Sequence, residues 1–107
     1  MTQIIPGTKT QFSIDPAILE LLPAQGSIEL QRDAAGKVHH FHTHPVDEIL
    51  VIISGRLSFT WEDGARICGA GDTILLPAGT LHQSEALDEG AVYAIATRPP
   101  VAIATGS

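Results

Sequence analysis

Turn-forming residues interrupt the apolar sequence at short intervals between positions 27 and 97, and this spacing limits what the chain can fold into. The segments between them are five to eight residues long and rich in β-branched and aromatic residues. Segments of this kind are typical of strands, and many short strands favour an all-β sandwich or barrel. The expected strands cover residues 27–32, 37–44, 48–54, 56–62, 65–69, 73–77 and 91–97.

The turns between these strands have recognisable chemistry. Gly55 is expected to end one strand, and Asp63-Gly64 is expected to form a tight hairpin because both positions tolerate positive φ. Pro77 and Gly79 suit the second and fourth positions of a type I turn.

One segment departs from the strand pattern. In residues 15–22, Asp15 is a suitable N-cap, Pro16 follows at the first helical position, and apolar residues come in pairs after it. A short N-terminal helix or helical turn is therefore expected there.

The segment 48–54 is apolar on both faces of the predicted strand. Alternation places Leu50 and Ile52 on one face and Ile49, Val51 and Ile53 on the other. One face can point into a barrel, and the other must be covered by the N-terminal segment or by a second subunit. Of these alternatives we predict a homodimer.

Composition excludes some partners. The chain has 107 residues, room for one domain spanning 1–107, and a formal charge of −6, whereas a nucleic-acid partner requires clustered positive charge. The longest apolar run, Ile49–Ile53, is too short to cross a membrane. No signal peptide is visible, and the single Cys68 is expected to be a packing residue in a reducing, cytoplasmic setting.

Histidines are concentrated in one segment, because four of the five lie between positions 39 and 44. On a strand, His42 and His44 share a face, about 6.6 Å apart along the backbone, so both imidazoles can reach one metal. Glu48 has the same parity and can return from the next strand, while His82 follows a turn and can add a fourth ligand. Such a set suits Fe, Mn, Ni or Zn as one divalent transition metal per chain.

The glycines and prolines around these histidines resemble two signatures of the cupin superfamily. In residues 36–55, Gly36 is followed after five residues by His42, then by His44, Glu48 and Gly55 at the family's spacing. In residues 71–86, Gly71 is followed after five residues by Pro77, then by Gly79 and His82. The second block departs once, because Ala86 stands where the family commonly has Asn. That Asn is not a ligand in the family.

The resemblance implies a small single-domain cupin, a jelly-roll β-barrel that is usually a dimer. It implies a metal inside the barrel mouth, held by His42, His44, Glu48 and His82.

Other residues are open to two interpretations. His40 shares the parity of His42, so it is either a general base, substrate contact or support for a ligand in the cavity, or an exposed rim residue. His39 is expected to face outward and Asp47 to be a turn or surface acid. Phe59, Trp61 and Tyr93 are either substrate-binding residues or ordinary core residues.

Two classes of function follow. The first is a metal-dependent enzyme acting on a small molecule, with dioxygenase-like oxidation first and isomerase or lyase chemistry next. The second is a non-catalytic cupin that binds or senses a small ligand, which is motivated by the short chain. A cupin with a vestigial site is disfavoured because all four ligand positions are intact.

Overall fold

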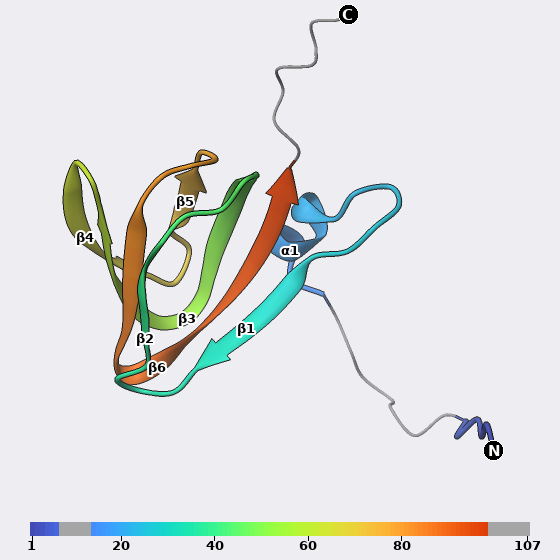
Figure 1. Ribbon diagram of the computed structural model, residues 1–107. Coiled ribbons are helices and arrows are strands. Elements are labelled where there is room, and N and C mark those ends of the chain that lie inside the picture. The colour runs from blue at the N-terminus through green and yellow to red at the C-terminus, as the bar shows by residue number, and fades with distance from the viewer. Residues whose placement is uncertain (7–13, 99–107) are drawn as a thin grey trace, which may run out of the picture.

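The computed structural model of the protein describes residues 1–6 and 14–98, which form one short helix and six strands (Figure 1). In chain order these are α1 (Pro16–Leu21), β1 (Glu29–Asp33), β2 (Val38–His42), β3 (Asp47–Trp61), β4 (Gly64–Gly69), β5 (Thr73–Leu76) and β6 (His82–Arg98). Within those residues, no helix has the length and apolar character that crossing a membrane requires.

Two long antiparallel strands, β3 and β6, organise the fold. The first half of β3 pairs with β5 and with the second half of β6, which also pairs with β1. The second half of β3 pairs with β4 and with the first half of β6, which also pairs with β2. Figure 1 shows these two sets of paired strands diverging from each other, so that they form the two walls of a cup-shaped barrel. This is the predicted all-β jelly-roll barrel.

Glycines allow both long strands to bend between the two walls. Gly55 has φ +74° and Gly90 has φ +72°, values that side chains other than glycine's rarely adopt. A Cβ atom on Gly55 would overlap the carbonyl oxygen of Gly90, so the two backbones meet at this corner. The prediction that residues 48–54 and 56–62 are separate strands was wrong, because pairing with β6 continues past the bend.

Other turns also differ from their predicted forms. Trp61 pairs with Gly64, so the hairpin turn consists of Glu62 and Asp63, neither of which has positive φ. The amide of Thr80 donates to the carbonyl of Pro77 at 3.2 Å, which puts Gly79, with φ +81°, at the third position of a type II turn.

Residues 82–90 belong to β6 and were not predicted as strand, because their polar composition hides the alternation.

The barrel has an inner core and an outer one. The inner core lies between the two walls and consists of Leu50, Ile52, Leu57, Phe59, Cys68, Leu76, Ala86, Ala91 and Tyr93. Burial raises the pKa of the Cys68 thiol, as expected of a packing residue. The outer core joins Leu21 of α1 to Val51, Ala94 and Ala96. The second apolar face of β3 is therefore covered in part by α1, whose Asp15 cap accepts a hydrogen bond from the amide of Ala17 at 2.8 Å.

Candidate metal centre

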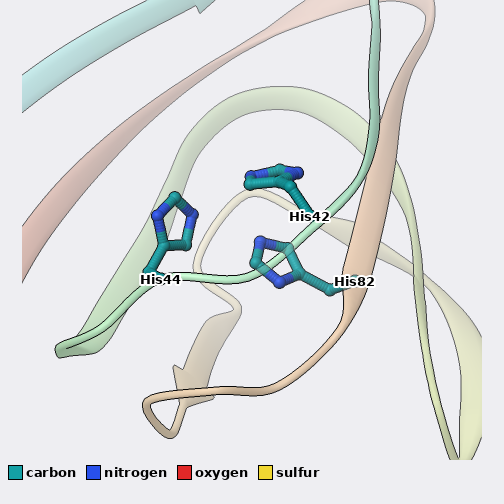
Figure 2. Close-up of side chains that lie close together, drawn as sticks. All are labelled: His42, His44 and His82. Carbon is teal, nitrogen blue, oxygen red and sulfur yellow. The ribbon is translucent and has the colours of Figure 1, made fainter.

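Three imidazoles meet at the mouth of the barrel. His42 is the last residue of β2 and His82 is the first residue of β6, and the antiparallel register pairs the two directly. His44 lies two residues beyond the end of β2. One nitrogen from each ring lies within 4.8 Å of the others, and Figure 2 shows the three rings turned towards a common space.

Backbone carbonyls orient two of these rings. Nδ1 of His42 is 2.6 Å from the carbonyl oxygen of His40, and Nδ1 of His82 is 2.8 Å from that of Thr80. A carbonyl can only accept a hydrogen bond, so each Nδ1 carries the hydrogen and each Nε2 keeps a free lone pair. In this tautomer Nε2 can bind a metal ion, and such support of the other ring nitrogen is common around metal sites.

The carboxylate of Glu48 lies beside this triad. Its Oε1 is 3.7 Å from Nε2 of His44, and its side chain is 12% exposed. Two ligands that each lie ~2.1 Å from one metal are separated by about 3–3.5 Å, so the distance between Glu48 and His44 is close to that of two ligands of one ion. The structure gathers the three predicted histidines closely and leaves Glu48 adjacent to them.

His82 is the most buried member of the triad, with 5% of its surface exposed. Burial lowers its pKa, and the neighbouring His42 and His44 lower it further, against the opposing effects of the Thr80 carbonyl and Glu48. The neutral imidazole that a metal requires is therefore the favoured form.

The triad opens into a pocket of about 200 Å³ between the two walls. Its lining residues include no lysine or arginine, so any positive charge must come from a bound ion or a protonated histidine. They are Glu29, Gln31, His39, His42, His44, Glu48, Leu50, Phe59, His82, Ser84, Tyr93 and Ile95.

The turn that precedes His82 is attached to the segment that carries His44. The amide of Gly79 donates to the carbonyl of His44 at 2.8 Å, and the amide of Ala78 donates to Oδ1 of Asp47 at 2.8 Å. Asp47, expected to be a turn or surface acid, therefore connects the two signature blocks.

The prediction that His39 faces outward was wrong, and of the two interpretations of His40 the structure agrees with the exposed rim residue. His39 lines the pocket, whereas His40 is exposed and does not line it. The register between β2 and β6 shifts between His39 and His42, so one extra residue reverses the alternation on which the prediction relied. His40 therefore loses the geometric basis for a catalytic role.

The three predicted aromatic residues have different positions. Phe59 lines the pocket and stacks on His82, with ring centroids 5.6 Å apart. Tyr93 also lines the pocket and is 3% exposed. Trp61 packs against Phe59 and lines a neighbouring pocket of about 280 Å³ instead.

Sequence reasoning did not identify Asp33 or Ser84 as site residues. The alternating polar residues Glu29, Gln31 and Asp33 did indicate one polar face of β1. That pattern does not say whether the polar face points into the barrel, because the answer depends on pairing with β6 more than fifty residues away.

A bent two-walled β-barrel with a histidine triad in its mouth is the architecture of a cupin with a candidate metal site. The chain belongs to the Cupin domain family, whose profile matches residues 29–97. Among curated protein sequences, none is significantly similar to it.

Solved structures of similar fold include two enzymes. The dimethylsulfoniopropionate (DMSP) lyase DddQ of Ruegeria pomeroyi DSS-3 is 28% identical over 69% of this chain and 38% of its own, with a TM-score of 0.64. The oxalate decarboxylase of Bacillus subtilis, which has Mn(II) centres, is 27% identical over 65% of this chain and 20% of its own, with a TM-score of 0.62. The chain thus spans well under half the length of either enzyme.

A third structure matches in size. A protein of unknown function from Rhizobium leguminosarum bv. viciae 3841 is 22% identical over 86% of this chain and 100% of its own, with a TM-score of 0.64. At this identity the likeness concerns the fold alone.

Proposed function

We propose that this protein is a metal-dependent enzyme that acts on a small molecule by lyase or isomerase chemistry. The observation that carries the proposal is the triad of His42, His44 and His82, whose nitrogens converge within 4.8 Å at a pocket of about 200 Å³. The pocket is large enough for a small ligand beside the triad.

The ligands would be the three histidines together with Glu48, around one divalent Fe, Mn, Ni or Zn ion per chain. When bound, such an ion polarises a carbonyl group and stabilises negative charge on oxygen. Phe59 would hold the ring of His82 in place by stacking on it, and Tyr93 would border the ligand on the β6 side.

The similar structures favour one reaction class. They include proteins named as a lyase and a decarboxylase, both more than 25% identical to this chain. These names support lyase chemistry over the dioxygenase-like oxidation that the sequence placed first.

Non-catalytic binding of a small ligand is the second candidate. Leu50, Phe59 and Ile95 give the pocket an apolar side that can bind a molecule without transforming it. Turnover of any small hydroxy or carbonyl compound by the metal-loaded protein would decide for the enzyme.

A cytoplasmic location remains a prediction from the lone Cys68.

Metal analysis tests the proposal directly. Untagged protein reconstituted with Fe, Mn, Ni or Zn and then desalted should retain close to one ion per chain with at least one of these metals. His44→Ala should abolish retention, whereas His40→Ala, a matched change at an exposed position, should not affect it. Failure of the wild type to retain any of the four metals would refute the proposal.

A further inference from the structure

A second polar cluster lies in the same pocket and involves no predicted metal ligand. Gln31 and Asp33 come from β1, His39 from β2 and Tyr93 from β6. Gln31, His39 and Tyr93 line the pocket, and Asp33 is buried behind them with 5% of its surface exposed.

Hydrogen bonds in this cluster converge on the carboxylate of Asp33. Its Oδ2 accepts from the Tyr93 hydroxyl at 2.7 Å and lies 3.0 Å from Nε2 of His39, while its Oδ1 accepts from the Gln31 amide at 3.1 Å. Burial acts to raise the pKa of Asp33, but the hydrogen bonds from Tyr93, Gln31 and His39 outweigh it and lower the pKa overall. Asp33 is therefore an anion near neutral pH.

These contacts determine the tautomer of His39. An ionised carboxylate only accepts, so Nε2 of His39 must carry the hydrogen that points to Asp33. The Gln31 amide uses its two hydrogens on Asp33 and on the Tyr93 hydroxyl, which is 3.0 Å away. Nε2 of Gln31 also lies 2.9 Å from Nε2 of His39. Since both nitrogens donate to the carboxylate of Asp33, this contact is not a hydrogen bond.

In this tautomer Nδ1 of His39 has a free lone pair, on a side chain that is 30% exposed and lines the pocket. A carboxylate that holds the opposite nitrogen orients the ring and stabilises the imidazolium that forms when Nδ1 takes a proton. We infer that His39 is the acid–base residue of this pocket, that Asp33 is its positioning residue, and that the ligand is a small neutral carbonyl compound. This inference deepens the proposed function and rests on it.

The charge of the lining favours a neutral ligand. Glu29 and Glu48 supply two carboxylates, which offset the charge of one divalent ion, and no lining lysine or arginine remains to pair with an anionic substrate. Leu50 and Ile95 offer apolar contact to the carbon skeleton. An α-hydroxyketone is a small, neutral compound that carries the carbonyl group.

The proton transfer balances within the pocket. Nδ1 of His39 takes a proton from the carbon next to the carbonyl, the electron pair of that C–H bond forms the enolate, and the charge on the imidazolium is balanced by Asp33. If the Nδ1–H of the imidazolium exchanges with solvent before the proton returns to the same carbon, solvent hydrogen enters the ligand. In an α-hydroxyketone, transfer of the hydroxyl proton to the enolate oxygen, followed by protonation of the former carbonyl carbon by Nδ1, isomerises the ligand. No oxidant or reductant is required.

Hydrogen exchange provides the first test, with hydroxyacetone as the probe. The full chain loaded with Zn(II) in D₂O should exchange the carbon-bound hydrogens of hydroxyacetone, measured by proton NMR. His39→Ala should slow exchange at least ~100-fold, the usual contribution of a general base. Asp33→Asn should slow it about 10-fold or more, because the carboxylate that orients the histidine is lost, and His40→Ala should match the wild type. Zinc content is measured in every sample, so that a lost metal is not mistaken for a lost base.

The second test needs neither metal nor turnover. Nitrogen-15 NMR of the imidazole rings in the metal-free protein should show His39 as the Nε2–H tautomer, and Asp33→Asn should change the tautomer populations while circular dichroism shows an intact fold. A wild-type His39 protonated on Nδ1, or exchange that is absent from zinc-loaded wild type or unaffected by His39→Ala, would overturn the inference. If the wild type retains no metal, the proposed function fails. The tautomer of His39 then shows separately whether Asp33 orients the His39 ring as inferred.

Discussion

Among the glycines of the described residues, Gly55 and Gly90 leave the least space for a side chain, and both have positive φ. The carbonyl oxygen of Gly90 occupies the space that a Cβ on Gly55 would need. A Cβ on Gly90 would lie 2.6 Å from the carbonyl oxygen of Asp33. The bend of β3, the bend of β6 and the end of β1 are therefore coupled at one corner.

Gly55→Ala is expected to destabilise the protein by about 3 kcal/mol or more. A left-handed backbone costs alanine ~1–2 kcal/mol, and relief of the backbone overlap adds to this. Urea unfolding of the metal-free protein measures the change. Gly71→Ala is the matched control, since Gly71 has φ +91° but open space around it. Equal losses from the two substitutions would contradict the steric explanation.

Asp33 is expected to make stability depend on pH in the acid range. Its folded-state pKa lies below the unfolded value of ~3.9, so its contribution is present above about pH 4 and is lost as the pH falls through the folded-state pKa. Asp33→Asn should lower the free energy of unfolding at pH 7 by about 1–3 kcal/mol.

Unfolding at several pH values measures this contribution. The gap between wild type and Asp33→Asn should narrow between pH 4 and pH 3, whereas the same change at the exposed Asp88 should produce no gap. A gap that stays constant down to pH 3 would show that Asp33 does not act through its charge.

At the scale of elements, the site depends on how β2, β3 and β6 are joined. Pairing of β2 with β6 places His42 beside His82, and the turn 77–80 is attached to the first block through the carbonyl of His44 and the carboxylate of Asp47. The imidazole of His44 is therefore positioned by the connection that follows β2.

Asp47→Ala is expected to lower metal affinity about 10-fold, because the turn before His82 loses its hydrogen bond to β3. Asp72→Ala is the matched control, since Asp72 accepts a backbone hydrogen bond at the same 2.8 Å from Gly69 in another turn. Both variants should lose ~1 kcal/mol of stability, but only Asp47→Ala should lose affinity in zinc titrations. Equal affinities would remove Asp47 from the support of the site.

At the scale of the whole molecule, α1 covers only the middle of the outer apolar face. Leu30 pairs with Ala94 of the outer core, and Leu75 pairs with Ile49, which packs against that core. Both leucines therefore share the outer face, yet they are 60% and 72% exposed. Exposed apolar area beside a covered centre suits association with a second copy.

Light scattering after size exclusion is expected to give twice the mass of one chain. Leu30→Lys together with Leu75→Lys should produce monomers, because two charges would be buried at the interface. Ile67→Lys on β4, at a residue that is 56% exposed, should leave the dimer intact. A wild-type mass of one chain at micromolar concentration would refute the homodimer.

The all-β class, the helical turn and the candidate ligand set could be predicted from the sequence, because they depend on local patterns. Strand alternation, the Asp15-Pro16 cap and the spacing of His42, His44 and His82 each involve residues that are close in the chain or framed by short signature blocks. Local physics is strong at these positions, so short segments carry the information.

Which residues line the pocket depends on contacts between segments that are distant in the sequence. His39 replaced His40 in the pocket because the pairing of β2 with β6 shifts by one residue, and no local pattern in "HHFHTH" records that shift. Asp33 and Tyr93 meet across 60 positions of sequence. A strand reverses every side chain when its register moves by one, so the wall of the pocket that contains His39 and Tyr93 depends on packing between strands and not on periodicity within them.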